Sequence, residues 1–540
     1  MSNQLNKSQV ELAWPSEFPY AVLAEAAALG SDPTSDQIEA EIAAGRHDFR
    51  NRRTITIDDE DAKDLDDAVD IQALPGGGLR LGVHIADVSH YVGDGGLLDQ
   101  EARRRGTSVY PVGRVIPMLP PGLSNGICSL NPGCDRLTLS VILTFDANGV
   151  VEDGQIVESI IRSKARTTYT VVEQVLSQGD EQPAGPFPEF NSDLGLMQQL
   201  AIKLKARRRQ RGAINFDFPE TYIELSDDGK PIDIRPYPAG QANELIESFM
   251  IAANEYIARQ FYFTGVPFVY RVHEQPDREK LTRFLKMAAV FGVKARIRGT
   301  ATPGQLAGVL EQVRHENYGP ALAELLLRSL AKARYAPKNL GHFGLASEYY
   351  CHFTAPIRRY PDLFIHRVIK ARLKTGHIKK SWREATPLIA EQSSEAERLA
   401  MQIERDSVAE KMAEYMLDKL GEIYDGVISG FGPAGIYVRL ASTIEGLIPY
   451  RSLDDYYIYD EEQLRAATRS GARSFSIGDQ VRVQVARADV DQRQIDFELL
   501  SSVDPPKAKV SKQKSVPGKV KTGREKSRKT AGRGRRKRLR

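Results

Sequence analysis

The chain has few cysteines and no long apolar run. Only Cys128, Cys134 and Cys351 occur among its 540 residues. They form neither a CxxC pair nor a repeating spacing, which argues against a disulfide framework and a structural zinc site. The first residues, MSNQLNKSQVELAWP, contain no apolar core of a signal peptide, and no stretch of about 18 apolar residues follows. We therefore expect a soluble, cytoplasmic protein.

The net charge of +3 conceals an uneven distribution. Residues 507–540 contain 16 Lys or Arg and one acid, Glu525, so the rest of the chain, with 58 basic and 70 acidic residues, carries −12. The basic stretch has almost no large apolar residues, which predicts a disordered tail over residues 503–540. This tail would bind phosphates of structured RNA or the ribosome, or only keep the protein soluble, and the sequence leaves both open.

The densest feature is an acidic segment, residues 58–67, which holds six aspartates and one glutamate. Carboxylates at this density repel one another and are costly to desolvate, so inside a folded domain they require a cation or a basic ligand to neutralise them. Oxygen donors favour Mg²⁺, with Mn²⁺ as the alternative. Strand patterns at 53–57, 68–71 and 79–85, with a hairpin at 75–78, place the segment between core strands, where a site is expected. The plainer interpretation is a solvated acidic loop, and the flanking strands argue against it.

The rest of the chain predicts an α+β fold followed by a small β-barrel. Short helices are expected at 20–29 and 36–44, the second capped by Thr34 or Ser35, and an amphipathic helix at 243–261. A charged helix is expected at 393–420. Five short strands after it suit an OB-type barrel. These strands are expected at 426–428, 436–440, 446–448, 481–485 and 495–497.

Six motifs follow one another along the chain. They are TIDDEDAKDLDDAV from Thr56, LGVHIADVSHYV from Leu81, RGTSVYPVGRVIPMLPPGLSNGICSLNPGCDR from Arg105, GAINFDFPE from Gly212, YRVHEQPD from Tyr270 and HFGLASEYYCHFTAPIRRYPDLFIHR from His342. Together they resemble the RNB exoribonucleases, the family of ribonuclease II and ribonuclease R, and more nearly its ribonuclease R branch. The resemblance extends from about residue 10 to about residue 500.

The resemblance implies a domain order and a function. The expected parts are a helical connector (1–45), an RNB catalytic domain (46–420), an S1 RNA-binding domain with an OB fold (421–502) and the basic tail (503–540). The chain would lack the N-terminal cold-shock domains of ribonuclease R. By resemblance it is a monomeric, processive exoribonuclease that degrades single-stranded RNA from a free 3′ end to nucleoside 5′-monophosphates by metal-assisted hydrolysis.

The resemblance also assigns roles to residues of the acidic segment and of a later turn. The expected metal ligands are Asp58, Asp64, Asp66 and Asp67. Asp66 would be the carboxylate most closely tied to the chemical step. In the turn Ala355–Pro361, Arg358 would be the catalytic arginine, because a planar guanidinium can contact a phosphate through two hydrogen bonds. Arg359 would contact the RNA backbone, or carry only surface charge.

Aromatic residues are the expected RNA contacts, because every base has a face on which an aromatic ring can stack. By resemblance Tyr110 and Phe216 enclose the terminal bases and set the length of the last fragment. Phe431 and Tyr437 are the candidates in the S1 domain, although either one alone is more often a core residue. Pro433 and Ala434 stand between them where the family pattern is more aromatic.

Other polar residues in these motifs have plainer interpretations. His84 and His90 are expected to have structural hydrogen-bonding roles. His366 and Arg367 could face the same channel as Arg358, although a histidine such as His366 is more often buried and hydrogen-bonded. Either Glu397 or Glu404 of the late helix would approach the site, and the sequence does not distinguish them.

Two other functional classes stay open from the sequence. One is a non-catalytic RNA-binding regulator that keeps the RNB and S1 domains, but the loss of an essential aspartate or of Arg358 that would favour it is not seen. The other is a metal-dependent endonuclease, which a closed channel ending in base-stacking residues would disfavour.

Overall fold

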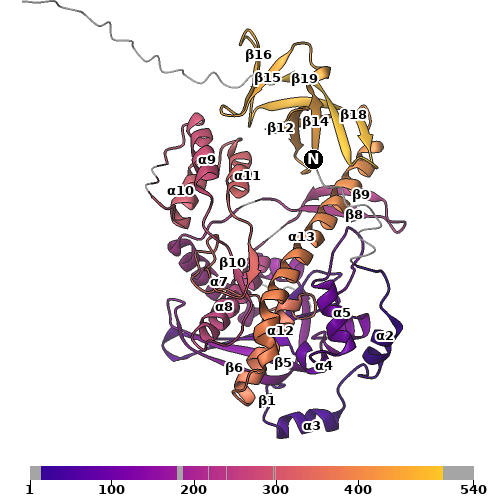
Figure 1. Ribbon diagram of the computed structural model, residues 1–540, viewed down its shortest axis with the longest axis vertical. Helices are drawn as coiled ribbons and strands as arrows, with labels where there is room; N and C mark the ends of the chain where they lie inside the picture. Colours follow the sequence, from indigo (N-terminus) through magenta and orange to yellow (C-terminus); the bar gives the residue numbers. More distant parts are fainter. Residues whose placement is uncertain are drawn as a thin grey trace, which may run out of the picture. The chain divides into compact units, whose positions relative to one another are not determined.

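The computed structural model describes residues 14–502 except 179–186, 217, 239, 296 and 298, so the predicted basic tail lies outside the described residues. The N-terminal part contains a mixed sheet of seven strands in the order β1-β6-β5-β4-β3-β2-β7. Strands β1, β5 and β6 of this sheet are labelled in the lower part of Figure 1. The strands are β1 (His47–Asp48), β2 (Ile55–Asp58), β3 (Asp67–Ala73), β4 (Leu79–Ala86), β5 (Asp135–Phe145), β6 (Val151–Arg162) and β7 (Ala165–Thr168). The three strands predicted around the acidic segment are therefore confirmed to within two residues.

Neighbouring strands run antiparallel in the middle of the sheet and parallel at its two edges, where β1 pairs with β6 and β7 pairs with β2. Apolar side chains of the strands and of helices α7, α8 and α12 form one large buried core. The helices are α2 (Tyr20–Ala27), α3 (Ser35–Ala43), α4 (Val88–Tyr91), α5 (Leu97–Arg105), α6 (Tyr169–Gln178), α7 (Asn191–Arg211), α8 (Gln241–Tyr262), α9 (Arg278–Val290), α10 (Pro303–Val313), α11 (Gly319–Ser329), α12 (Tyr360–Lys374) and α13 (Lys380–Leu417).

Two predicted helix features are confirmed, and a third is only partly right. Thr34 caps α3 in a capping box with Gln37, and the amphipathic pattern at 243–261 forms α8. The charged helix predicted at 393–420 is α13, which begins earlier, at Lys380, and ends at Leu417, with Pro387 inside it. Along its length α13 contacts β11 (Arg334–Ala336), which pairs with β10 (Tyr270–Val272). In Figure 1 the helix continues past β10 to the C-terminal barrel.

The C-terminal part is a closed five-stranded barrel in the order β12-β13-β14-β19-β18. Its strands are β12 (Ile423–Phe431), β13 (Gly435–Leu440), β14 (Glu445–Pro449), β18 (Gln480–Asp489) and β19 (Gln494–Ser502). All five predicted barrel strands are confirmed, as is the α+β fold class. The sequence analysis missed a three-stranded sheet between β14 and β18, made of β15 (Tyr457–Asp460), β16 (Arg465–Thr468) and β17 (Ser474–Ser476).

A second core cluster joins helices α9 to α11 to residues near the barrel. It consists of Ile214, Leu281, Phe284, Met287, Ala288, Val293, Ala301, Leu306, Val309, Val313, Ala321, Leu322, Leu326, Leu330, Phe343, Leu464 and Ile477. Leu464 and Ile477 come from the inserted sheet region. A two-stranded hairpin, β8 (Thr221–Leu225) and β9 (Pro231–Pro236), also contacts the barrel, where the hydroxyls of Thr221 and Thr443 lie 2.7 Å apart.

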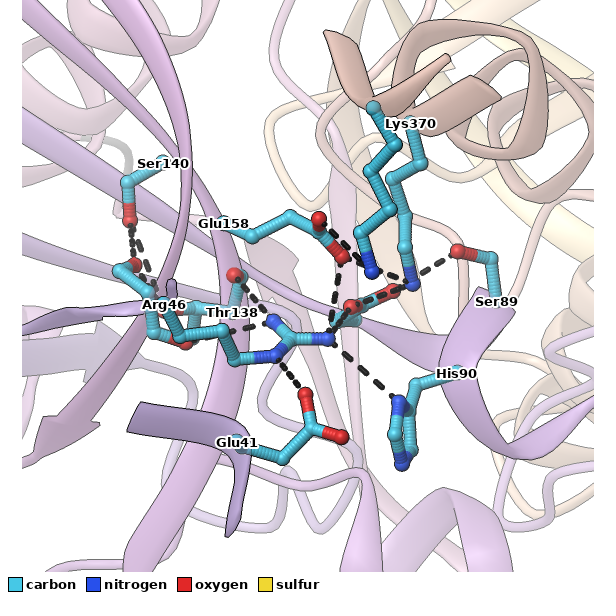
Figure 2. A network of polar contacts seen from close by, with 11 residues as sticks. Glu41, Arg46, Ser89, His90, Thr138, Ser140, Glu158 and Lys370 are labelled. Carbon is cyan, nitrogen blue, oxygen red and sulfur yellow. Dashed lines mark hydrogen bonds and ion pairs between the residues drawn. The ribbon is translucent and has the colours of Figure 1, made fainter. Parts of the chain in front are cut away.

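A buried charge network lies beside the large core, centred on Arg46 (Figure 2). The Arg46 guanidinium lies 2.6 Å from Asp87 and 2.5 Å from Glu41 of α3. Glu158 of β6 is 3.3 Å away. Because Arg46 and Asp87 have almost no exposed side-chain surface, each depends on the other for its charge to be tolerated.

The same network binds α12 to the sheet. Lys370 of α12 lies 2.7 Å from Asp87 and 3.5 Å from Glu158, and Lys374 lies 3.0 Å from Glu158. The His90 ring, also drawn in Figure 2, has its Nδ1 atom 3.5 Å from Arg46, which agrees with the expected structural role. The network therefore ties α3, the sheet and α12 together, and α12 begins directly after Arg359.

Candidate active site

The acidic segment forms the loop between β2 and β3. Asp58 is the last residue of β2 and pairs with Thr168 of β7, and Asp67 is the first residue of β3 and pairs with Ile85. Between them, Leu65 is fully buried and anchors the loop in the core. The two strands thus fix both ends of the loop.

Asp66 is held by the turn that carries Arg358. The carboxylate is only 4% exposed, and its Oδ1 atom accepts a hydrogen bond from the Ile357 backbone N–H at 2.8 Å. Its Oδ2 atom lies 3.6 Å from the Arg358 Nε atom. The structure therefore brings together the aspartate and the arginine that the sequence assigns to the chemical step.

Burial makes the charged form of three carboxyl groups in the loop energetically costly. Burial, with the neighbouring Asp67 carboxylate, raises the pKa of Asp58 to about 8. Burial raises the pKa of Asp67 to about 6, although the charges of Arg358 and Arg359 oppose this. Burial also raises the pKa of Asp66 well above its usual range. These groups need either protons or a compensating positive charge.

The donor atoms of the loop fit a hard divalent cation. Within residues 14–502, apart from the gaps noted above, no group of three or more His, Cys, Asp or Glu side chains is arranged as a formed metal site. The fit depends instead on the chemistry of the donors: Asp58 Oδ2 and Asp66 Oδ2 are buried carboxylate oxygens without a hydrogen-bond partner. Such oxygens are ligands that Mg²⁺ and Mn²⁺ prefer.

Two residues that the sequence analysis missed hold the loop from outside. The Arg166 guanidinium on β7 donates to the backbone carbonyls of Glu60 and Ala62, each at 2.7 Å, and more weakly to that of Asp59. The Tyr237 hydroxyl donates to the Asp59 side chain at 2.7 Å. Both residues lie more than a hundred positions away along the chain. No sequence motif pointed to them.

The two arginines of the turn have different surroundings. The Arg358 side chain is 46% exposed, so its guanidinium is open to an incoming phosphate. The Arg359 side chain is mostly buried, and its Nη2 atom donates to Asp362 Oδ1 at 2.6 Å. Arg359 is therefore held within the protein, which favours a role in fixing the turn over free surface charge.

Tyr110 reaches the acidic loop. Its hydroxyl donates to Asp64 Oδ2 at 2.9 Å, and 38% of its surface remains exposed. Its backbone N–H donates to Glu404 Oε1 at 2.9 Å, whereas Glu397 forms an ion pair with Arg271 at 2.6 Å. The structure thus shows that Glu404 is the late-helix acid that approaches the site. Burial raises the pKa of Glu404.

The other predicted RNA contacts lie away from the carboxylates. Phe216 packs against the second core cluster, where its ring stacks on Phe218 with centroids 5.7 Å apart. Phe431 also borders that cluster, and its ring stacks on Tyr459 of the inserted sheet at 5.4 Å. Tyr437 on β13 is 37% exposed. One face of Phe431 is therefore already covered, while the Tyr437 ring is more accessible.

His84 and His366 are buried and each has a hydrogen-bond partner within the protein. The buried His84 ring lies between Ser140 Oγ and Asp70 Oδ2, each 2.6 Å from a ring nitrogen. His366 is buried, with its Nε2 atom 2.8 Å from the Phe353 carbonyl, and burial lowers its pKa to about 4. The predicted buried histidine is confirmed.

Comparison with known proteins finds two domain families in the chain. The family model "RNB domain" matches residues 46–375, and the model "S1 RNA binding domain" matches residues 417–500. Ribonuclease R 1 of Lactococcus lactis is 44% identical over 494 residues, covering 90% of this chain and 60% of that protein. Ribonuclease R of Thermotoga maritima is 41% identical, covering 91% of this chain and 69% of that protein.

A solved structure has the same fold. It is Mycoplasma genitalium RNase R in complex with ribose methylated single-stranded RNA, with a TM-score of 0.84 and 29% identity. The match covers 91% of this chain and 77% of the solved chain. The chain therefore spans most, but not all, of the length of the proteins it resembles.

Proposed function

This chain belongs to the family defined by the RNB domain, and from that premise we propose that it is a metal-dependent exoribonuclease. The proposed reaction is the hydrolysis of single-stranded RNA from a free 3′ end, processively, to nucleoside 5′-monophosphates and a short final fragment. We propose the cytoplasm as its location. None of the helices in the described part of the chain has the length and apolar character needed to cross a bilayer.

One observation supports this proposal above the others: the acidic loop and the arginine turn meet at Asp66. The carboxylate contacts the Ile357 N–H on one side and lies near the Arg358 guanidinium on the other. Phosphodiester hydrolysis needs a group that accepts a proton or binds a cation, and a positive group that binds the phosphate. The buried Asp66 carboxylate suits the first role, and the exposed Arg358 guanidinium suits the second.

The proposed cation is Mg²⁺ or Mn²⁺, held by Asp58, Asp64, Asp66 and Asp67. When bound, it would supply Lewis acidity toward the phosphate and toward water. The residues of the chain supply the rest. Arg358 would bind the scissile phosphate and offset the negative charge that develops on it. Arg166 and Tyr237 would keep the loop in place.

Tyr110 is the proposed contact for the last base. Its hydroxyl is fixed by Asp64 and its backbone by Glu404, so the partly exposed ring has a defined orientation. A rigid ring of this kind can stack on any base, which suits a nuclease without sequence preference. Phe216, Phe431 and Tyr437 remain proposed RNA contacts further from the carboxylates. Arg359, whose charge acts on Asp67 and whose guanidinium pairs with Asp362, remains a proposed contact to the RNA backbone beside the acidic loop.

A non-catalytic RNA-binding regulator is the alternative from another class. It would need the RNA contacts but not the paired carboxylates and arginine. All of Asp58, Asp64, Asp66, Asp67 and Arg358 are present, and buried carboxyls with raised pKa values are costly to keep without a function. We therefore favour the nuclease.

The test uses one 5′-labelled RNA in linear and circular form, with purified protein and either Mg²⁺ or EDTA. Conversion of the linear RNA directly to a short fragment, only with Mg²⁺ and with circles intact, is the expected result. Cleaved circles would indicate an endonuclease. Binding without cleavage would favour the RNA-binding alternative. Asp66→Asn is the matched inactive control.

A further inference from the structure

Trp14 is buried behind the segment that carries Tyr110. Only 3% of its surface is exposed. It belongs to a small apolar cluster, which we call the Trp14 cluster. The Trp14 cluster consists of Trp14, Val109, Ile116, Ala400 and Ile403. The indole Nε1 donates a hydrogen bond to the backbone carbonyl of Thr107 at 3.0 Å. The indole thus contacts the Tyr110 segment through both packing and a hydrogen bond.

The segment held by Trp14 is paired with the arginine turn on its other side. The Ser108 N–H and the Thr107 hydroxyl donate to the Arg358 backbone carbonyl at 2.9 and 3.0 Å. The Tyr360 N–H donates to the Gly106 carbonyl at 3.0 Å. Trp14 therefore fixes one side of a short strand-like segment whose other side fixes the backbone of Arg358.

The same segment ends at Tyr110. Glu404, which accepts the Tyr110 N–H, directly follows Ile403 of the Trp14 cluster. One indole therefore contacts both supports of Tyr110: the chain that leads to it and the helix that caps its backbone. Movement of the indole would be transmitted to the Tyr110 ring, whose hydroxyl reaches Asp64.

We propose that Trp14 is a positioning residue for Tyr110, and that through it the segment before the RNB domain helps to set the length of the final RNA fragment. This inference rests on the proposed function, in which the Tyr110 ring stacks on the last base. Trp14 acts through the Thr107 carbonyl and through packing. Loss of the indole N–H leaves that carbonyl without this donor and loosens the segment.

Trp14→Phe removes the donor and keeps an aromatic ring. Trp382→Phe is a matched control, because Trp382 is 5% exposed and donates from Nε1 to Asp94 at 3.1 Å. It lies on α13 roughly 30 Å along the helix from the Trp14 cluster. The measurement is the length distribution of final fragments and the single-turnover rate on 5′-labelled RNA. Trp14→Phe should shift the final fragments and slow the last steps about three- to tenfold. Trp382→Phe should leave the fragments unchanged.

A double-mutant cycle separates positioning from general stability. In a Tyr110→Ala background, Trp14→Phe should have no further effect on fragment length. Wild-type fragments and rate from Trp14→Phe, or effects that simply add to those of Tyr110→Ala, would overturn the proposal. Trp14→Tyr, which also lacks the indole N–H, replaces Trp14→Phe if the latter does not fold. Wild-type protein that degrades no RNA would refute the proposed function instead.

Discussion

The backbone N–H of Ile357 donates a hydrogen bond to Asp66 Oδ1 at 2.8 Å, across 291 residues of sequence. The next residue, Arg358, lies with its Nε atom 3.6 Å from the other carboxylate oxygen. The distance between the aspartate and the arginine is therefore fixed by a backbone contact as well as by their charges. An asparagine at position 66 has the same shape and can keep the hydrogen bond to Ile357 without the charge. The catalytic role of Asp66 can therefore be tested separately from its structural role.

Asp66→Asn should abolish turnover while RNA binding survives. The amide oxygen of asparagine can still accept the Ile357 N–H, but the negative charge is lost. We expect a rate at least about a hundredfold lower, with RNA affinity close to that of the wild type. Single-turnover cleavage and fluorescence anisotropy on the same RNA measure the two quantities. Asp61→Asn, at an exposed position of the same loop, is the control. Equal loss of binding and cleavage would mean that Asp66 supports the fold.

Arg166→Lys should weaken the response to Mg²⁺. Lysine keeps the charge, but its single ammonium cannot reproduce the planar guanidinium that reaches the Glu60 and Ala62 carbonyls. Outer partners of this kind typically contribute about tenfold or more to metal affinity, so the Mg²⁺ concentration for half-maximal rate should rise about tenfold. Arg162 at the end of β6 forms a partly exposed ion pair with Asp135 of β5, and Arg162→Lys should leave the Mg²⁺ dependence unchanged. An unchanged Mg²⁺ dependence in Arg166→Lys would show that the loop does not need this anchor.

Local sequence patterns predicted much of the secondary structure, because strand alternation and helix capping depend on residues close together in the sequence. Alternation of apolar residues placed the five barrel strands, and Thr34 capped its helix as expected. The acidic segment was recognisable because so many carboxylates cannot be buried without compensation. The β15–β17 sheet was missed because its strands have three or four residues, too few for a clear alternation.

The partners of the acidic loop could not be predicted. Arg166 is a single arginine in a short strand, and its role depends on the parallel pairing of β7 with β2. Glu397 and Glu404 are both followed by arginine and both lie on α13, so the sequence treats them alike. Only tertiary contacts distinguish them, because Arg271 pairs with Glu397 and the Tyr110 backbone reaches Glu404.

The buried His366 ring should make the folded protein less stable in mild acid. Burial lowers its pKa to about 4 from 6.5, so between these values the unfolded chain binds more protons than the folded one. The contribution of the neutral ring to the free energy of unfolding is fully present above pH 6.5. It is lost as the pH falls toward 4, at up to about 1.4 kcal/mol per pH unit. His366→Gln should therefore flatten the pH dependence of the free energy of unfolding in this window, measured by denaturant titration. His377→Gln, at an exposed position, should not. The same slope in both variants would contradict the assignment.

Asp87→Asn should destabilise the protein strongly. The Asp87 carboxylate has no exposed side-chain surface and lies between Arg46 and Lys370 at 2.6 and 2.7 Å, and these two charges hold its pKa well below the usual range despite burial. Asparagine would leave excess buried positive charge, at a cost of about 3 to 5 kcal/mol. Asp48→Asn removes a partly exposed ion pair with Arg50 and should cost no more than about 1 kcal/mol. Thermal and denaturant unfolding of both variants provide the comparison. A cost for Asp87→Asn as small as that for Asp48→Asn would mean that Glu41 and Glu158 alone neutralise the network, and that α12 does not depend on Asp87 for its place behind Arg358.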